Sequence, residues 1–144
     1  MAIATSRLLG EILVQEGLTT SEVVQRALAR AQTNGERIGE ALVALGAVTE
    51  DDVLRALSLQ QDLPYLWREE FPSSVPVLKN VSAKYLRQAR VCPISLEGST
   101  LTVASADPLN TLITDELRQV TGLNVKIVIS PAVAITEAIE DRDA

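Results

Sequence analysis

Apolar side chains recur every three or four residues over the first sixty positions, which is the period of an amphipathic helix. The pattern predicts one short helix that ends at Gly17 and a second that begins after Thr20, because glycine favours a helix stop and a threonine hydroxyl favours an N-cap. Helices this short are not stable alone, so each must pack against a partner. The apolar positions are Leu9, Ile12, Leu13, Val24, Ala27, Leu28 and Ala31.

The same plan returns after 29 residues. Residues 8–31 align with residues 37–60, and ten of the 24 columns are identical. Residues 32–36, QTNGE, are expected to form a polar turn between the copies. A repeat of this length is typical of a supersecondary unit whose copies bury each other's apolar faces. We therefore expect residues 1–61 to form a helical subdomain of two hairpins, which either holds a ligand of matching symmetry or simply closes a small core.

Residues 62–80 break this pattern. Three prolines exclude a regular helix through the stretch, and three of the four aromatic residues lie in it: Tyr65, Trp67 and Phe71. We expect a linker that packs on the surface through its aromatic side chains and marks a subdomain boundary.

Residues 81–144 alternate between helical and β-branched stretches, in the order α-β-β-α-β-α. Ser82 is the expected cap of the first helix, and two strands meet at Glu97 and Gly98 with the spacing of a hairpin. Pro108 is expected in the first turn of the next helix. A strand over 124–130 and a final helix complete a small α/β subdomain, a sheet covered by helices. The fold class is therefore α+β, with the helical repeat first.

Composition narrows the possible functions. The net charge of −6 disfavours binding to nucleic-acid polymers, which depends on Lys and Arg. The chain has no histidine and one cysteine, Cys92, so it lacks a Ser-His-Asp triad, the usual zinc sites and any internal disulfide. Its glycines form neither a P-loop nor a dinucleotide-binding fingerprint, and no apolar run is long enough to span a bilayer. These absences predict a soluble, cytoplasmic protein that is not an enzyme and holds no metal or cofactor.

The second copy carries the residues whose chemistry best suits the binding of a ligand. Arg37 can hold a phosphate or the edge of a guanine, Gly39 lets a ligand approach the backbone, and the Gln60 amide both donates and accepts. Each has a plainer interpretation, such as a solvated arginine at a helix start or a close contact between helices at the glycine. Leu42, Val53 and Leu57 either form the apolar floor of such a site or are ordinary core residues.

Residues 8–60 resemble the tandem 24-residue cyclic di-GMP-binding motif at the N-terminus of type II secretion and type IV pilus assembly ATPases. The family pattern runs R-L-G-x-x-L-x-x-x-G, six residues, L, three residues, L, two residues, Q, with a five-residue spacer between copies. Residues 62–141 are similar to the companion domain of those ATPases. The resemblance implies that the binding positions of the second copy are Arg37, Ile38, Gly39, Leu42, Gly46, Val53, Leu57 and Gln60.

The first copy keeps the scaffold of the motif but not its polar positions. Leu8 stands where the pattern has arginine, and Ala31 stands where it has glutamine. Gln32 is one residue after Ala31, so on a helix its side chain points about 100° away from the direction of Ala31 unless the helix end unwinds. Arg7 is one residue before Leu8; it precedes the helix and can act as a partial substitute for the arginine. The other implied binding positions of the first copy are Leu9, Gly10, Leu13, Gly17, Val24 and Leu28.

Two functions stay open at this point. In one, the domain senses cyclic di-GMP and reports its occupancy to a downstream ATPase motor, which this chain does not contain. In the other, it is a docking module for the cytoplasmic part of an inner-membrane secretion or pilus protein, and its nucleotide site is degenerate. The aromatic linker around Trp67 and Phe71 is the expected anchor. Either way, the protein is expected to reach the inner membrane through its partner, with no insertion of its own.

Overall fold

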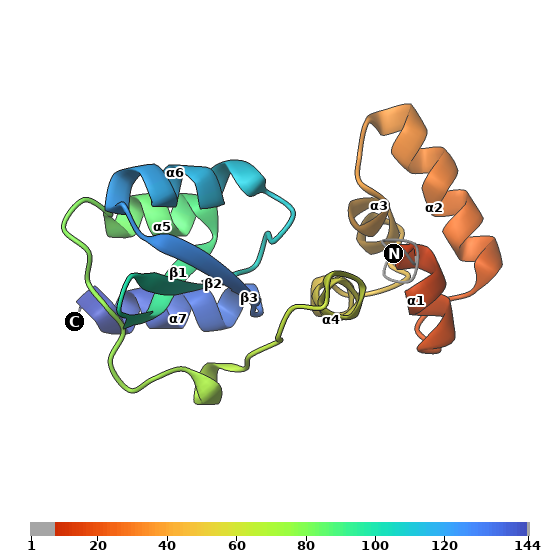
Figure 1. Cartoon of the computed structure of the whole chain (residues 1–144). Coiled ribbons are helices and arrows are strands. Elements are labelled where there is room, and N and C mark those ends of the chain that lie inside the picture. The colour runs from red at the N-terminus through yellow and green to blue at the C-terminus, as the bar shows by residue number, and fades with distance from the viewer. Residues whose placement is uncertain (1–7, 144) are drawn as a thin grey trace. The chain divides into compact units, whose positions relative to one another are not determined.

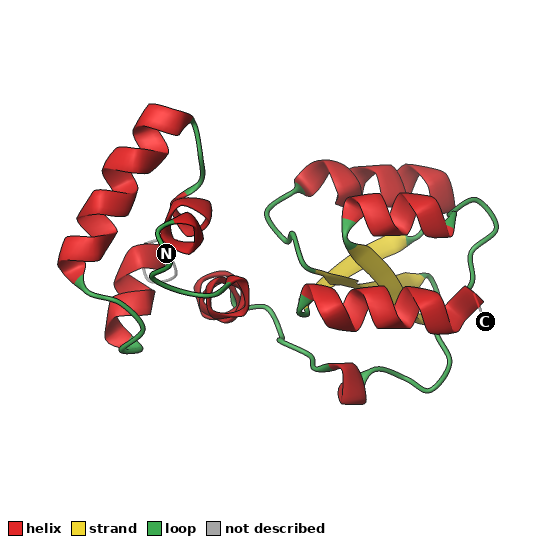
Figure 2. Ribbon diagram, turned by 180° about the vertical axis from the view of Figure 1, so that it is seen from behind, coloured by secondary structure: helices red, strands yellow, loops and turns green. Residues whose placement is uncertain are grey.

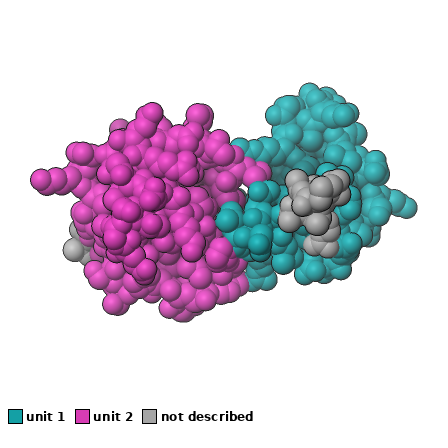
Figure 3. All heavy atoms as spheres, in the orientation of Figure 1, with its two compact units in different colours: residues 1–63 teal, residues 64–144 magenta. Residues whose placement is uncertain are grey.

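The computed structural model describes residues 8–143, and the chain divides into two compact units, residues 1–63 and residues 64–144 (Figure 3). Unit 1 is helical over its described residues, and unit 2 combines helices with one sheet (Figures 1 and 2). This is the predicted α+β fold with the helical repeat first, so the prediction of the fold class is confirmed. Within residues 8–143, no helix combines the length and the apolar character needed to cross a bilayer.

Each copy of the repeat in unit 1 forms a pair of helices. The first copy forms α1 (Leu9–Gln15) and α2 (Ser21–Asn34), and the second forms α3 (Ile38–Ala44) and α4 (Glu50–Gln61). Gly17 and Gly46 follow the first helix of each copy with φ angles of +76° and +73°. Side chains with a β-carbon rarely adopt these angles, which explains why both copies have glycine at this column.

Threonine caps the second helix of each copy, but the two caps differ. The Thr49 hydroxyl accepts a hydrogen bond from the Asp52 N–H at 3.1 Å, and the Asp52 carboxylate accepts one from the Thr49 N–H at 3.0 Å. This reciprocal pair is a capping box. The Thr20 hydroxyl accepts a longer hydrogen bond from the Val23 N–H, at 3.4 Å. Val23 stands where the second copy has Asp52, and its side chain cannot accept a hydrogen bond from the Thr20 N–H. The start of α4 is therefore held more firmly than the start of α2.

The two copies interlock in unit 1. α1 packs against α4 and α2 packs against α3, so the first helix of each copy contacts the second helix of the other. Because the contact between α1 and α4 has its counterpart in the contact between α3 and α2, the unit has an approximate two-fold symmetry. Its buried apolar residues are Leu9, Ile12, Leu13, Ala27, Ala31, Ala41, Leu42, Val48, Leu54, Ala56 and Leu57.

α2 is longer than the sequence pattern predicts. The expected turn over residues 32–36 is wrong in its first half, because the helix continues to Asn34 and ends at Gly35, whose φ is +66°. The Thr33 hydroxyl donates to the Ala29 carbonyl at 3.0 Å, so this polar residue is accommodated within the last turn. The polar residues of this segment indicate exposure to solvent, and they are compatible with an exposed helical turn as well as with a loop.

Unit 2 is built on a three-stranded sheet in the order β1-β2-β3. β1 (Val91–Glu97) and β2 (Thr100–Ser105) form an antiparallel hairpin, and β3 (Asn124–Ile129) runs parallel to β2. The helices are α5 (Ala83–Ala89) before β1, α6 (Thr111–Thr121) between β2 and β3, and α7 (Ala132–Asp143) at the end. The strands lie between α6 and α7 in Figure 1.

The strand register separates apolar from polar positions. Leu101 of β2 pairs with Leu96 and Val125, whereas the next residue, Thr102, pairs with Lys126. Leu101 is fully buried and Lys126 is exposed. Because successive side chains of a strand point to opposite faces, one face of the sheet supplies core and the other is polar at this end.

The start of the helix predicted at Asp107 and Pro108 is wrong by one turn. Asp107 and Pro108 lie in a turn that the Asn110 N–H closes on the Asp107 carbonyl at 3.1 Å, and α6 begins only at Thr111. The Asp107 N–H is held by the Ser105 hydroxyl at 3.0 Å. These bonds extend the end of β2 into a turn, so the proline serves the turn and not the helix.

Residues 64–80 form the start of unit 2 and pair with the end of β3. The Ile129 N–H donates to the Pro64 carbonyl, and the Leu66 N–H donates to the Ile129 carbonyl, each at 2.8 Å, so this segment adds a short parallel bridge to β3. A 3-10 turn, η2 (Arg68–Glu70), follows. Trp67 is 41% exposed, but Phe71 is only 7% exposed. The expectation of an exposed aromatic anchor is therefore wrong for Phe71, which packs inward beneath the Arg68 guanidinium.

Candidate functional site

The first glycine of each motif copy, Gly10 or Gly39, lies against a valine of the following helix. A β-carbon added to Gly39 would lie 2.8 Å from Cγ1 of Val53, and one added to Gly10 would lie 2.7 Å from Cγ1 of Val24. Both distances are shorter than real contacts of β-carbons. Close helix packing is therefore sufficient to require glycine at these two positions, without a ligand.

Most of the apolar motif positions are core. Leu9, Leu13, Leu42 and Leu57 are buried, so their side chains hold the four helices together. Ile38, Val24 and Val53 are half-buried. A role in the core thus accounts for these leucines, whereas Ile38, Val24 and Val53 have surface that a ligand could contact.

The polar positions of the second copy lie at separate points on the hairpin. Arg37 is the exposed residue that precedes α3, and its N–H donates to the Glu40 carboxylate at 2.8 Å. Gln60 is half-buried near the end of α4. Since Gly39 contacts Val53, the seven residues from Val53 to Gln60 place the amide about 10 Å further along α4. The two polar positions therefore come from the residue before α3 and from the last turns of α4.

The first copy has no matching polar groups at its described positions. Leu8 is 65% exposed and Ala31 is 8% exposed. Gln32 lies within α2, where the helix continues unbroken, so it points away from the direction of Ala31. Arg7, the predicted partial substitute, lies outside the described residues.

The apolar positions also differ between the copies at one column. Leu57 is 5% exposed, but its counterpart Leu28 is 42% exposed. Leu28 therefore belongs to the surface of the first copy together with Leu8, where apolar side chains face solvent. The symmetry of the scaffold does not extend to the surface.

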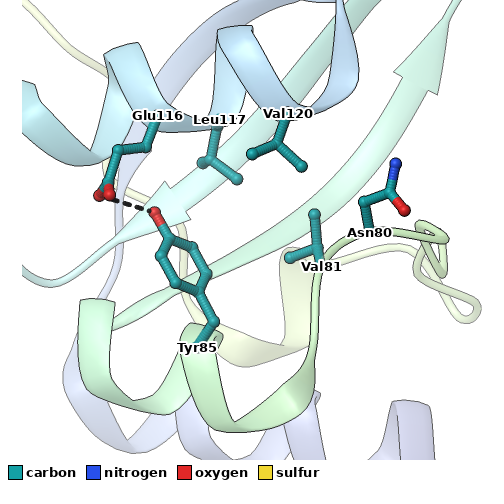
Figure 4. Close-up of a pocket in the computed structure, with 6 residues that line it drawn as sticks. All are labelled: Asn80, Val81, Tyr85, Glu116, Leu117 and Val120. Atoms are coloured by element: carbon teal, nitrogen blue, oxygen red, sulfur yellow. Dashed lines mark hydrogen bonds between the residues drawn. The ribbon is translucent and has the colours of Figure 1, made fainter.

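Unit 2 has a small pocket that the sequence analysis did not predict (Figure 4). It has a volume of about 70 Å³ and lies between α5 and α6. Its lining is mostly apolar, with Tyr85 and Glu116 on one side: the Tyr85 hydroxyl donates to the Glu116 carboxylate at 3.2 Å. Ligand pockets usually measure about 300 Å³ or more, so this one is too small for a dinucleotide. Its residues are Asn80, Val81, Tyr85, Glu116, Leu117 and Val120.

The environment of Tyr85 changes its acidity. Burial raises the pKa of the phenol above its usual value, and the negative charge and hydrogen bond of Glu116 raise it further. Tyr85 and Glu116 are 31 residues apart in helices that only the fold brings together, so no local motif could have indicated the pair. Residues 8–143 contain no group of three or more His, Cys, Asp or Glu side chains placed to hold a metal ion.

With this geometry in place, the comparison with known proteins identifies the class of domain. The family model of the MshEN domain matches residues 61–142, which is more than half of the chain, and the chain belongs to this family. The predicted family is confirmed. The matched range comprises unit 2 and the residues that lead into it, so the tandem repeat lies before it.

Two curated relatives are type IV pilus assembly ATPases. The chain is 36% identical over 132 residues to the type IV pilus assembly ATPase PilB of Myxococcus xanthus, which is 92% of this chain and 23% of that protein. It is 34% identical over 122 residues to PilB of Thermus thermophilus, which is 82% of this chain and 14% of that protein. The chain thus spans less than a quarter of the length of these relatives.

Solved structures share the fold over both units. The structure of MshE with cdg, that is, cyclic di-GMP, has a TM-score of 0.77 and 25% identity, and the match covers 94% of this chain and 99% of that one. The N-terminal domain of XpsE has a TM-score of 0.73 and 24% identity, with 92% and 91% covered. At that identity, XpsE supports the fold alone. The binding roles of single residues stay predictions.

Proposed function

We propose that this chain is a non-catalytic regulatory domain of a bacterial pilus or secretion ATPase and that unit 1 binds cyclic di-GMP. The observation that carries the proposal is the second copy of the repeat. It keeps Arg37 and Gln60 at the polar positions of the motif, on a folded α3–α4 pair. The match to MshE with cdg over 94% of the chain supports the choice of ligand.

The chemistry of the second copy suits a guanylate. The Arg37 guanidinium can make two parallel hydrogen bonds to a phosphate or to the N7/O6 edge of guanine. Ile38 and Val53 are half-buried and offer apolar contact between the arginine and the Gln60 amide. In this role the domain reports the concentration of cyclic di-GMP to the ATPase motor to which its relatives belong.

Isothermal titration of cyclic di-GMP into the chain tests the proposal. With protein on the order of tens of micromolar, binding heat is expected from the wild type. Removing one charge-assisted bond costs about 1.5–3 kcal/mol, so Arg37→Ala should bind about tenfold to a hundredfold more weakly. Gln60→Ala should lose less, because its amide is neutral.

Matched controls lie in α2. Arg26→Ala removes an exposed arginine from the same unit, and Gln25→Ala removes an exposed glutamine; both should bind like the wild type. Absence of heat from the wild type would refute binding. Equal binding by Arg37→Ala and Arg26→Ala would leave the activity standing and remove Arg37 from the site.

One observation favours a second function, docking to the cytoplasmic part of an inner-membrane secretion or pilus protein. Trp67 is 41% exposed and stands edge-on to Tyr65, with ring centroids 5.2 Å apart. Exposed tryptophan is frequent among residues that anchor protein interfaces. Such a partner would hold the domain and its downstream motor at the cytoplasmic side of the membrane.

A pull-down with the cytoplasmic domain of the cognate membrane protein tests the docking role. Trp67→Ala should weaken retention, whereas Val77→Ala should not, although Val77 is 68% exposed and lies in the same segment. Full retention of Trp67→Ala would exclude this segment from the interface.

A further inference from the structure

The two motif copies of unit 1 share their scaffold contacts, but among the described residues only the second copy has arginine and glutamine at the polar positions. The scaffold contacts repeat: Gly10 meets Val24 as Gly39 meets Val53. Arg37, however, has its counterpart in Leu8, which is 65% exposed. Gln60 likewise has its counterpart in a buried alanine, Ala31.

The ligand of the proposed function is two-fold symmetric, whereas the polar positions of the two motif copies are not. Cyclic di-GMP consists of two identical guanylate halves and carries two phosphate charges. One chain supplies one arginine at the motif positions among its described residues, so one half of the ligand is matched. The other half would face Leu8 and Leu28, which are 65% and 42% exposed and cannot pair with a phosphate.

We propose that one molecule of cyclic di-GMP bridges two copies of this chain, each of which holds one guanylate half through Arg37 and Gln60. The inference rests on the proposed function. Two copies bring two arginines to the two phosphates, so the charges balance across the two-fold axis of the ligand. Contact between the copies would also cover the apolar side chains of Leu8 and Leu28. Association is then linked to the ligand, which binds the pair more tightly than a single copy.

The stoichiometry of the titration tests the bridge. We expect one ligand for two chains, and light scattering after gel filtration should show the mass of the full chain double when ligand is added. Arg37→Ala should abolish the doubling at the same ligand concentration, and Arg26→Ala should keep it. A complex of one ligand with one monomeric chain would overturn the bridge and leave the proposed function intact.

Restoring the first copy gives an independent test. Leu8→Arg adds the missing arginine at an exposed position, so it is compatible with folding. It should shift the stoichiometry toward one ligand per chain and reduce the doubling of mass. Leu8→Met is the control that keeps an apolar side chain and should still give the doubled mass.

The remaining outcomes are also decisive. A dimer that holds two ligand molecules would overturn the bridge, since each copy would then fill its own site. A one-to-one complex of the wild type that Arg7→Ala weakens would overturn it too, because Arg7 would then grip the second half. Absence of heat from every chain would refute the proposed function itself, together with the bridge.

Discussion

Gly39 and Val53 approach so closely that a β-carbon on the glycine would lie 2.8 Å from the valine methyl. The contact ties α3 to α4, and its counterpart between Gly10 and Val24 ties α1 to α2. This packing gives both glycines a structural role. The scaffold of the motif can therefore be present in a copy that lacks arginine and glutamine at the polar positions.

Replacing Gly39 by alanine should destabilise unit 1. Overpacking against a short branched side chain costs about 1–3 kcal/mol, which exceeds the gain of about 0.5–1 kcal/mol from the helix propensity of alanine. We expect a net loss of about 1 kcal/mol in the free energy of unfolding. Urea denaturation followed by circular dichroism at the helical band measures it.

A second substitution separates this clash from other causes. In a Val53→Ala background the obstructing methyl is gone, so Gly39→Ala should become neutral or stabilising. An unchanged loss in that background would show that the contact is not the reason for the glycine.

The two threonine caps should differ in strength. Thr49→Ala breaks a capping box whose bonds measure 3.1 and 3.0 Å, and caps of this kind contribute about 1–2 kcal/mol. Thr20→Ala removes a single bond of 3.4 Å and should cost about 0.5 kcal/mol. Thr49→Ser keeps the hydroxyl and should be close to the wild type. Equal losses from the two alanine variants, measured by urea denaturation, would contradict this ranking.

Glu40 should oppose an anionic ligand at Arg37. Its carboxylate accepts the Arg37 N–H at 2.8 Å and is exposed, so it brings negative charge to the position expected to hold a phosphate. Glu40→Gln removes the charge and can keep the capping bond. Affinity for cyclic di-GMP should rise about threefold, in line with an exposed charge interaction of up to 1 kcal/mol.

The matched variant for this prediction is Glu11→Gln, the same position in the first copy. It should leave the affinity nearly unchanged, and the gain from Glu40→Gln should shrink in high salt because exposed charges are screened. A gain that persists at high salt would point to a different cause.

The phenol of Tyr85 should titrate later than that of an exposed tyrosine. Burial and Glu116 raise its pKa in the folded state above the usual 10.0. Because the folded pKa is higher than the unfolded one, the stabilising contribution is fully present below pH 10.0 and is lost as the pH rises through the folded pKa of Tyr85. Absorbance at the phenolate band, compared with that of Tyr85→Phe, measures the titration.

Glu116→Gln provides the test of cause. It removes the negative charge but leaves the burial, so the Tyr85 pKa should fall toward 10.0 and stay above it. A titration that does not move would show that Glu116 has no part in the shift.

The repeat predicted much of unit 1, since local chemistry sets its helices and stops. Gly17, Gly46 and the threonine caps act within a few residues of their own position, so their effect is visible in sequence. The end of α2 was missed because polar residues suit a loop and an exposed helical turn equally. The start of α6 was missed because hydrogen bonds from Ser105 and within the turn compete with the helix that Pro108 favours.

Burial was harder to predict than secondary structure. Trp67 and Phe71 have similar sequence surroundings, yet Trp67 is exposed and Phe71 is buried. Phe71 lies beneath the Arg68 guanidinium, whereas Trp67 stands edge-on to Tyr65. The same holds for Leu28 and Leu57, which occupy one column of the repeat and differ in exposure. Periodicity states which face a residue lies on, and packing between elements decides whether that face is covered.

The sequence by itself determined the family of the domain, its order of elements and the absence of arginine and glutamine from the polar positions of the first copy, because these depend on residue identity and spacing. Tertiary structure decided how the copies interlock, why Gly10 and Gly39 must lack a side chain, and that Tyr85 meets Glu116. Those facts depend on contacts between segments distant in the chain. No local pattern encodes such contacts, since they arise only when the helices close on one another.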